Sequence, residues 1–285
     1  MSEMQSGYER VIRPRHAWFG IDWRRLLHYR DLLWILVRRD FVARYRQTIL
    51  GPLWFVLQPL IATSAFTLIF SRGLGTSTDR IEPSFLFYQC GMLVWGLFAT
   101  IFGSAGNTFQ LNAPVFTKVY FPRLIVPLAV VIGSLVPFTI QLAVFLVAWV
   151  PVLWGARTWS PNPLFLALLP LGLLQTAVFA FGISLLTSGL SAKYRDLQHT
   201  LPFLLQVWLF VTPVIYPLSE LRGAARWVAA LNPLTPVVES FRLGFFGVGT
   251  ISGALVAASL AATVMVFLAG LFSFQKAGRT FADTI

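Results

Sequence analysis

Residues 124–156 read LIVPLAVVIGSLVPFTIQLAVFLVAWVPVLWGA, a stretch without a single aspartate, glutamate, lysine or arginine. A helix rises about 1.5 Å per residue, so roughly 20 apolar residues cross the hydrocarbon core of a bilayer. Backbone polar groups in lipid need hydrogen bonds within the protein, which excludes an open sheet edge. The stretch therefore predicts one membrane-spanning helix.

Five more stretches lack these four residue types, and each is long enough for one crossing. They occupy residues 47–71, 83–117, 158–192, 197–219 and 243–275. We place the six spans at about 49–71, 85–106, 125–153, 164–190, 198–218 and 251–274. Of the 285 residues 56% are hydrophobic and 12% charged, whereas a soluble domain carries about 25% charged residues. The sequence predicts an all-α integral membrane protein with six transmembrane helices.

The distribution of basic residues predicts the orientation of these spans. An even number of crossings places both termini on the same side. With residues 1–46 assigned to the cytoplasm, sixteen Lys and Arg lie on the cytoplasmic side and six on the outer side, as the positive-inside rule requires. The tails at 1–28 and 281–285 are then both cytoplasmic. The net charge of +11 is thus an orientation signal beside anionic lipid, and we expect no nucleic-acid partner.

A helix is predicted over residues 29–46, immediately before the first span. Trp34, Val37, Phe41 and Tyr45 recur at helical spacing and form an apolar stripe. Long arginine side chains beside such a stripe can reach toward lipid headgroups. We expect an amphipathic helix at the membrane surface, acting either as a plain anchor or as a docking surface or phosphate clamp. Its candidate basic residues are Arg38, Arg39, Arg44 and Arg46.

The segment 213–249, between the fifth and sixth spans, differs from the other connections. It is moderately apolar and is interrupted by four prolines. Ser219 and Thr235 stand where helix N-caps are expected. Two helices of about ten residues would each be too short to span, and irregular backbone is tolerated at membrane depth only inside protein or beside a watery cavity. We expect an extracytoplasmic re-entrant segment at the outer mouth.

The sequence lacks the usual chemistry of ion-driven transport and of catalysis. The predicted spans contain no Asp, Glu, Lys or Arg, which argues against a proton- or sodium-driven transporter. None of the three lysines follows a glycine, so no ATP-binding loop of the G-x-x-x-x-G-K-[ST] type is present. Cys90 is the single cysteine, which rules out an intramolecular disulfide. We expect no catalytic residue, metal site or cofactor here, and any ATP-driven work must come from another polypeptide.

Four short motifs, taken in order, resemble one family. RDFVARYRQTILGPLW at 39–54 and QPL at 58–60 resemble its entry into the first span, and FPR at 121–123 resembles its first cytoplasmic loop. YRDL at 194–197 with TPVIYP at 212–217 is similar to its fifth span, and NPL at 232–234 with FR at 241–242 to its outer segment. The family is that of the ABC-2-type permeases, which export bacterial surface polysaccharides and teichoic acids.

The resemblance implies an ABC-2 transmembrane domain over about 29–280 in the bacterial inner membrane. It implies a homodimer of permeases with two separate ATPase subunits that carry ATP and Mg²⁺. The helix at 29–46 and the loop near 113–123 would then meet the ATPases. Residues expected to couple the loop to the ATPase are Ala113, Pro114, Lys118, Tyr120, Pro122 and Arg123.

The resemblance also implies a lipid-linked glycan as cargo, commonly carried on a polyprenyl diphosphate. Arginine suits bidentate phosphate contacts, so the four arginines before the first span are candidates for binding that diphosphate. Aromatic faces stack on sugar rings and leave the hydroxyls free, which suits a sliding polymer. The candidate channel residues nearer mid-span are Tyr88, Trp95, Trp149 and Trp208. Each ring could instead face lipid or a neighbouring helix.

Other cargoes and functions stay open at this point. The motifs do not separate O-antigen from capsule or teichoic acid, and drug- or lipid-exporting permeases share the six-helix topology. A lipid-modifying membrane enzyme would need a nucleophile–base pair, and a passive channel a charged pore ring; neither is evident. The leading prediction is the permease subunit of an ATP-driven glycan exporter.

Overall fold

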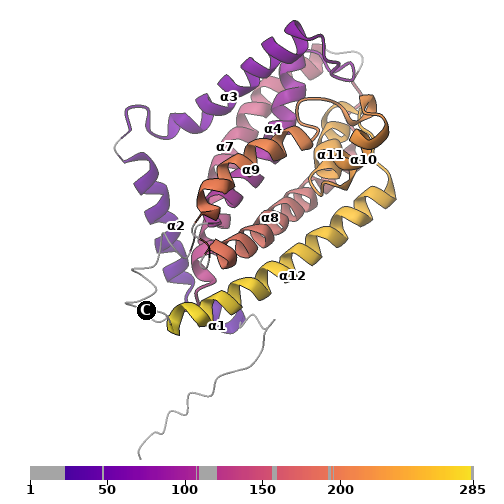
Figure 1. Cartoon of the computed structure of the whole chain (residues 1–285). Helices are drawn as coiled ribbons and strands as arrows, with labels where there is room; N and C mark the ends of the chain where they lie inside the picture. The colour runs from indigo at the N-terminus through magenta and orange to yellow at the C-terminus, as the bar shows by residue number, and fades with distance from the viewer. Residues whose placement is uncertain are drawn as a thin grey trace, which may run out of the picture.

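The computed structural model describes residues 23–46, 48–106, 108, 121–155, 159–191, 194 and 196–283, which form helices joined by turns and short irregular segments (Figure 1). Within this part of the chain, five helices are long and apolar enough to cross a membrane. All five lie where the charge-free stretches predict a span. They are Gly51–Gly73, which contains α3 (Trp54–Phe66), then α4 (Ser84–Ala105), α7 (Ile125–Gly155), α8 (Pro163–Ser191) and α12 (Gly253–Asp283).

Helix α9 is shorter than the sequence predicts. It spans Leu197–Val211, 15 residues, instead of continuing to residue 218. At about 1.5 Å per residue it measures roughly 22 Å, less than the roughly 30 Å hydrocarbon core. The helix ends because Thr212, at φ −86° and ψ 134°, precedes Pro213, and proline disfavours the helical conformation in the residue before it. The helix therefore ends seven residues before the predicted span boundary at 218, and that boundary stays a prediction.

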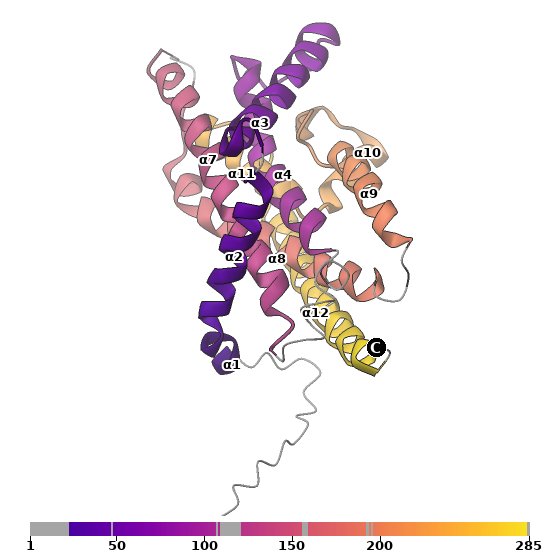
Figure 2. The ribbon, with the colours of Figure 1, turned by 90° about the vertical axis from the view of Figure 1, so that its left-hand side faces the viewer.

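Helix α4 is the centre of the fold, with α3, α7, α8 and α9 packed against it, while α12 lies along α8 (Figures 1 and 2). Of the 18 most apolar consecutive residues of α4, 72% are buried, whereas the corresponding share is 11% in the Gly51–Gly73 helix. The core is built on aromatic contacts: Phe98 of α4 stacks on Phe179 of α8 at 5.7 Å and touches Trp208 of α9 at 5.3 Å between ring centroids. Helix α4 thus holds α8 and α9 in place, while α3 keeps most of its surface free.

Helices α8 and α12 run side by side at very close range (Figure 1). A Cβ on Gly270 would lie 2.0 Å from the carbonyl oxygen of Gly182, and a Cβ on Gly182 would lie 2.6 Å from the Cα of Phe267. Small residues at a helix–helix contact let two backbones approach in this way. The absence of a side chain at these two positions therefore sets the spacing of the pair.

Helix α2 (Arg30–Tyr45), preceded by the short α1 (Trp23–His28), lies where the amphipathic helix is predicted. Its buried side chains, Leu36 and Val37, pack against α7 near Ile125. Trp34, which the predicted stripe includes, is 62% exposed. The predicted stripe is thus only partly right, because α2 carries apolar side chains on more than one face.

The segment 212–250, between α9 and α12, contains two short helices, α10 (Gly223–Leu231) and α11 (Thr235–Phe246). Helix α10 is largely exposed, whereas nearly all of α11 is buried against α4 and α8. Both predicted N-caps are wrong. Ser219 lies in a 3₁₀ turn, and Thr235 is already the first helical residue, its hydroxyl bonded to the carbonyl of Ala229.

Candidate functional site

The four basic residues predicted as a phosphate site, three in α2 and Arg46 directly after it, are not equivalent. Arg38 and Arg46 are exposed. Arg39 is already engaged, since its guanidinium binds the carboxylate of Asp40 at 2.7 and 2.8 Å. The side chain of Arg44 lies outside the described part of the molecule. Two of the four predicted arginines therefore offer an exposed cationic head to a phosphate group.

The loop predicted to meet an ATPase is described only at its end. Ala113, Pro114, Lys118 and Tyr120 lie outside the described residues. Arg123 donates a hydrogen bond from Nη1 to the carbonyl oxygen of Gly278 in α12, 155 positions further along the chain. Arg123, two residues before α7 begins, is thus fastened to the C-terminal part of α12.

Two of the four candidate channel aromatics lie inside the subunit core. Tyr88 is 0% exposed and touches Phe66 and Phe87 at 6.3 and 5.3 Å between centroids. Trp95 is 6% exposed and packs on Phe98. Within a single subunit, neither ring presents a free face to a passing polymer.

Trp149 and Trp208 are half-buried, and each indole nitrogen has a partner. Trp149 Nε1 donates to the carbonyl oxygen of Phe245 at 3.2 Å, and Trp208 Nε1 donates to Oδ1 of Asn232 at 3.3 Å. Both bonds reach the segment 212–250. Trp95 and Trp208 meet through Phe98, whereas Trp149 packs on Phe245 of α11. These two tryptophans fasten long helices to that segment, and a channel role for the set stays a prediction.

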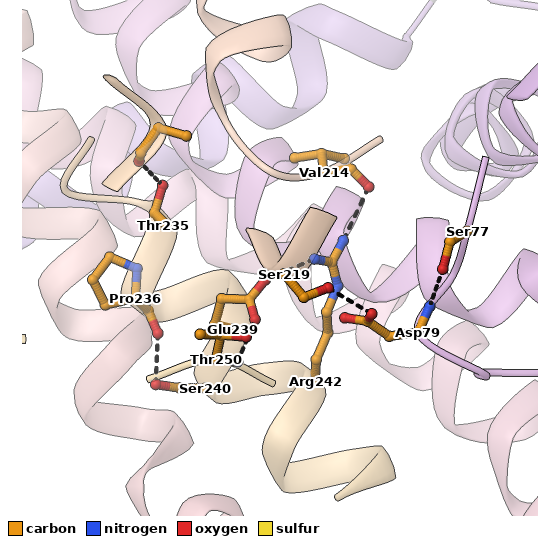
Figure 3. A network of polar contacts seen from close by, with 11 residues as sticks. Ser77, Asp79, Val214, Ser219, Thr235, Pro236, Glu239, Ser240, Arg242 and Thr250 are labelled. Carbon is orange, nitrogen blue, oxygen red and sulfur yellow. Dashed lines mark hydrogen bonds and ion pairs between the residues drawn. The ribbon is translucent and has the colours of Figure 1, made fainter. Parts of the chain in front are cut away.

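A deeply buried polar cluster lies on α11, at two residues that are not among the predicted site residues. Glu239 and Arg242, one turn apart on α11, form an ion pair of 3.0 Å with side chains 0% and 1% exposed (Figure 3). Their i, i+3 spacing places them on one face of a helix. A buried pair of this kind is stable only when the remaining donors and acceptors are also satisfied.

The structure supplies most of those partners from other segments. Arg242 Nη2 donates to the carbonyl oxygen of Val214 at 3.1 Å (Figure 3). The guanidinium carbon lies 3.7 Å from the ring centroid of Phe87. The second carboxylate oxygen of Glu239 accepts the backbone N–H of Thr250 at 2.7 Å. One ion pair therefore touches α4, the chain after α9 and the chain before α12.

A signal for this pair was present in the sequence. The segment 227–275 contains two charged residues, Glu239 and Arg242, of opposite sign and one helical turn apart. Arg242 is one of the six basic residues assigned to the outer side, and this assignment gave it no partner within the protein. Opposite charges at helical spacing in an apolar context indicate a buried pair.

Asn232 makes a second polar connection in the same region. Its amide nitrogen donates to Oγ1 of Thr212 at 2.8 Å, and its amide oxygen accepts from Trp208 and from the backbone N–H of Leu234. Asn232 links the end of α9 to the turn between α10 and α11. This explains the asparagine of the NPL motif at 232–234.

A hollow of about 440 Å³ lies between α8, α11 and α12. Its lining is mostly aliphatic, with Leu168, Leu171 and Leu260 partly exposed at its edge. Such a lining offers few hydrogen-bond partners for sugar hydroxyls and is suited to hydrocarbon. We therefore do not assign a glycan to it.

Among the described residues, no three His, Cys, Asp or Glu side chains gather in a way that could hold a metal ion. Cys90 is buried in α4. The described part of the chain thus offers positively charged, aromatic and ion-paired groups.

Comparison with known proteins identifies what this chain is similar to. A family model described as ABC-2 type transporter matches residues 31–246. The O-antigen export system permease protein RfbA of Myxococcus xanthus is 31% identical over 265 residues, covering 92% of this chain and 98% of the relative. RfbA of Klebsiella pneumoniae is 26% identical, covering 90% and 95%, and the polysialic acid transport protein KpsM of Escherichia coli is 27% identical, covering 73% and 78%.

Proposed function

The chain belongs to the ABC-2 type transporter family, and we propose that it is the permease subunit that moves a lipid-linked polysaccharide across the bacterial inner membrane. The observation that carries this proposal is the 31% identity to an O-antigen export permease over 92% of the chain. The apolar helices supply the membrane domain. Because the sequence contains no G-x-x-x-x-G-K-[ST] loop, a separate ATPase subunit provides the energy in this proposal.

An O-antigen-like polymer is the cargo we favour over capsule. The relatives named for O-antigen export match 90% or more of the chain, whereas KpsM matches 73% of it at lower identity than RfbA of Myxococcus xanthus. A polyprenyl diphosphate carrier would present its phosphates at the cytoplasmic surface, where α2 holds exposed arginines.

Deleting the gene tests the cargo. We expect the surface polysaccharide to disappear and the lipid-linked polymer to accumulate on the cytoplasmic side, with both effects reversed by the intact gene. The measurement is gel analysis of surface glycan together with extraction of lipid-linked polymer. Normal surface glycan in the deletion strain, combined with a loss of drug or lipid efflux, would select the other cargo class.

In the proposed topology, α9 and the turn residues after it form the fifth of six crossings, and both termini are cytoplasmic. After the 15-residue helix, residues 212–216 form turns and bends that lead to Pro217. The segment 212–250 then enters the membrane from outside. Support comes from the burial of α11, which protects its backbone as membrane depth requires.

Cysteine labelling tests this topology. Arg222→Cys replaces an exposed residue beyond the outer end of α9, and Thr200→Cys replaces an exposed residue in the first turn of that helix, while the native Cys90 is buried. We expect a membrane-impermeant maleimide added outside spheroplasts to label position 222 and to leave position 200 unlabelled until the membrane is opened. Labelling of both positions from the same side would show that α9 does not cross.

The exposed arginines of α2 are proposed to bind the carrier diphosphate. Replacing Arg38 and Arg46 together with alanine removes two charge-assisted contacts, so we expect export at limiting substrate to fall about tenfold. Polymer appearing at the surface after induction is the measurement. The control is Arg24→Ala with Arg30→Ala, exposed residues at the start of the same helical region. Equal loss in both double variants would indicate a general effect of positive charge.

We propose a homodimer with two ATPase subunits, in which the loop at 113–123 transmits ATPase closure. The hydrogen bond from Arg123 to Gly278 supports this route, because it connects the residues before α7 to a second long helix, α12. Support for a partner copy is the large free surface of the Gly51–Gly73 helix and of α9, where Phe203 and Phe210 are exposed. Separation of two such helices from their counterparts would open the path for the polymer.

A further inference from the structure

We propose that Arg242 is a positioning residue that transmits movement at the outer end of α9 to α11 and to the start of α12. The inference rests on the proposed function, in which α9 is a crossing of a permease that changes shape during export.

Arg242 holds the backbone immediately after α9. The carbonyl oxygen that it binds belongs to Val214, three residues beyond the last residue of α9, Val211. Val214 has little freedom of its own, since a Cβ on Gly91 of α4 would lie 3.2 Å from its Cα. A displacement of the outer end of α9 along α4 therefore acts directly on the guanidinium group.

Glu239 carries the connection to α12. One carboxylate oxygen accepts from Arg242, and the other accepts the backbone N–H of Thr250, three residues before α12 begins at Gly253. The two oxygens thus serve two different segments. Figure 3 shows Arg242 reaching toward Val214 with Glu239 and Thr250 beside it. The ion pair is the shared element of three backbone segments that are distant in sequence.

The pair is expected to move as one body. Both side chains are buried, so water is not at hand to replace a broken bond, and separating the charges would leave each one uncompensated. The ring of Phe87 covers one face of the guanidinium. Asn232 provides a parallel connection between α9 and the α10–α11 turn. Movement of α9 is therefore passed on to α11.

Hydrogen–deuterium exchange of the permease–ATPase complex in nanodiscs tests the transmission. In the wild type, we expect peptides covering 212–217 and Thr250 to change exchange together when ATP is trapped on a hydrolysis-deficient ATPase. The variant Glu239→Leu with Arg242→Met removes both charges at once and is expected to fold. In it, the resting exchange at Thr250 should rise about tenfold through loss of one charge-assisted hydrogen bond, and its response to ATP should vanish while that of 212–217 remains.

Several outcomes would overturn the proposal. One is an ATP response at Thr250 in the double variant equal to that of the wild type, and another is a wild type in which 212–217 does not respond. Should the double variant fail to accumulate, Arg242→Lys decides by the same comparison: it keeps the charge, but a single ammonium lacks the fork that reaches Glu239 and Val214 together. The control, Glu220→Leu with Arg222→Met, changes two exposed charges of the same segment and should leave both responses intact.

If the ion pair only stabilised the fold, a double variant that accumulates and assembles normally would show the same ATP response in both peptides as the wild type. The readout also needs no polysaccharide. If the proposed cargo is wrong, this test stays valid. If the double variant uncouples the two peptides but exports normally, the connection exists and export does not use it. That result would overturn the role of Arg242 as a positioning residue.

Discussion

Replacing Arg242 alone with methionine is expected to destabilise the permease by about 3–5 kcal/mol, because Glu239 is then left as an uncompensated charge in the interior. The loss is larger than for a surface arginine, whose ion pairs contribute about 0–1 kcal/mol. The measurement is reversible unfolding in mixed micelles, or the midpoint of thermal unfolding where unfolding is irreversible.

The control for this prediction is the double variant Glu239→Leu with Arg242→Met. Removing both charges leaves no uncompensated group, so stability is expected to return to within about 1–2 kcal/mol of the wild type. The comparison separates charge burial from loss of packing, since the same methionine is present in both variants. A double variant as unstable as the single one would show that the guanidinium acts through its contact with Phe87 and not through its charge.

The second large effect is expected at the contact between α8 and α12. Gly270→Ala introduces a methyl group whose position lies 2.0 Å from the carbonyl oxygen of Gly182, a backbone atom that cannot move without moving α8. The helices must separate, and overpacking of this kind costs about 1–3 kcal/mol or more. Lower accumulation in the membrane and a lower unfolding midpoint are the expected results.

Gly253→Ala is the matched control on the same helix, since a Cβ there meets nothing within 4 Å. We expect it to be neutral or slightly stabilising, because alanine favours a helix more than glycine does. If Gly270→Ala and Gly253→Ala behave alike, the close approach of α8 and α12 is not present in the membrane. Gly182→Ala should behave as Gly270→Ala does, because its Cβ would lie 2.6 Å from the backbone of Phe267.

The two predictions depend on different parts of the molecule. The first concerns the segment 212–250, where polar groups are buried and paired. The second concerns a contact between two long apolar helices, where the absence of side chains sets the distance. Together the two results show whether the buried polar contacts stabilise this membrane protein as well as its apolar packing does.

Most of the helical framework could be predicted from the sequence. Runs without ionised side chains coincide with the long helices, because charged groups are expensive in hydrocarbon and therefore mark the ends of each run. Helix α9 is the exception, and its end at Val211 follows from Pro213, a local signal that the count of charge-free residues overlooked. The resemblance to ABC-2-type permeases was likewise readable from short motifs and is confirmed by the family match.

The burial of particular side chains could not be predicted, for a physical reason. In a membrane helix every face is apolar, so the periodic pattern that marks the buried side of a soluble helix is weak. Tyr88 and Trp95 therefore resembled candidates for a channel, yet both lie in the core around α4. The stripe predicted on α2 included Trp34, which is exposed, because this helix carries apolar side chains on more than one face.

The sequence by itself determined the class of the protein, the positions of its long helices and its family, since these follow from local composition and short motifs. Only the tertiary structure decided that α4 is the centre, that Gly182 and Gly270 set a helix spacing, and that Glu239 and Arg242 join the ends of α9 and α12. These features depend on atoms brought together from distant parts of the chain, and no local pattern carries that information.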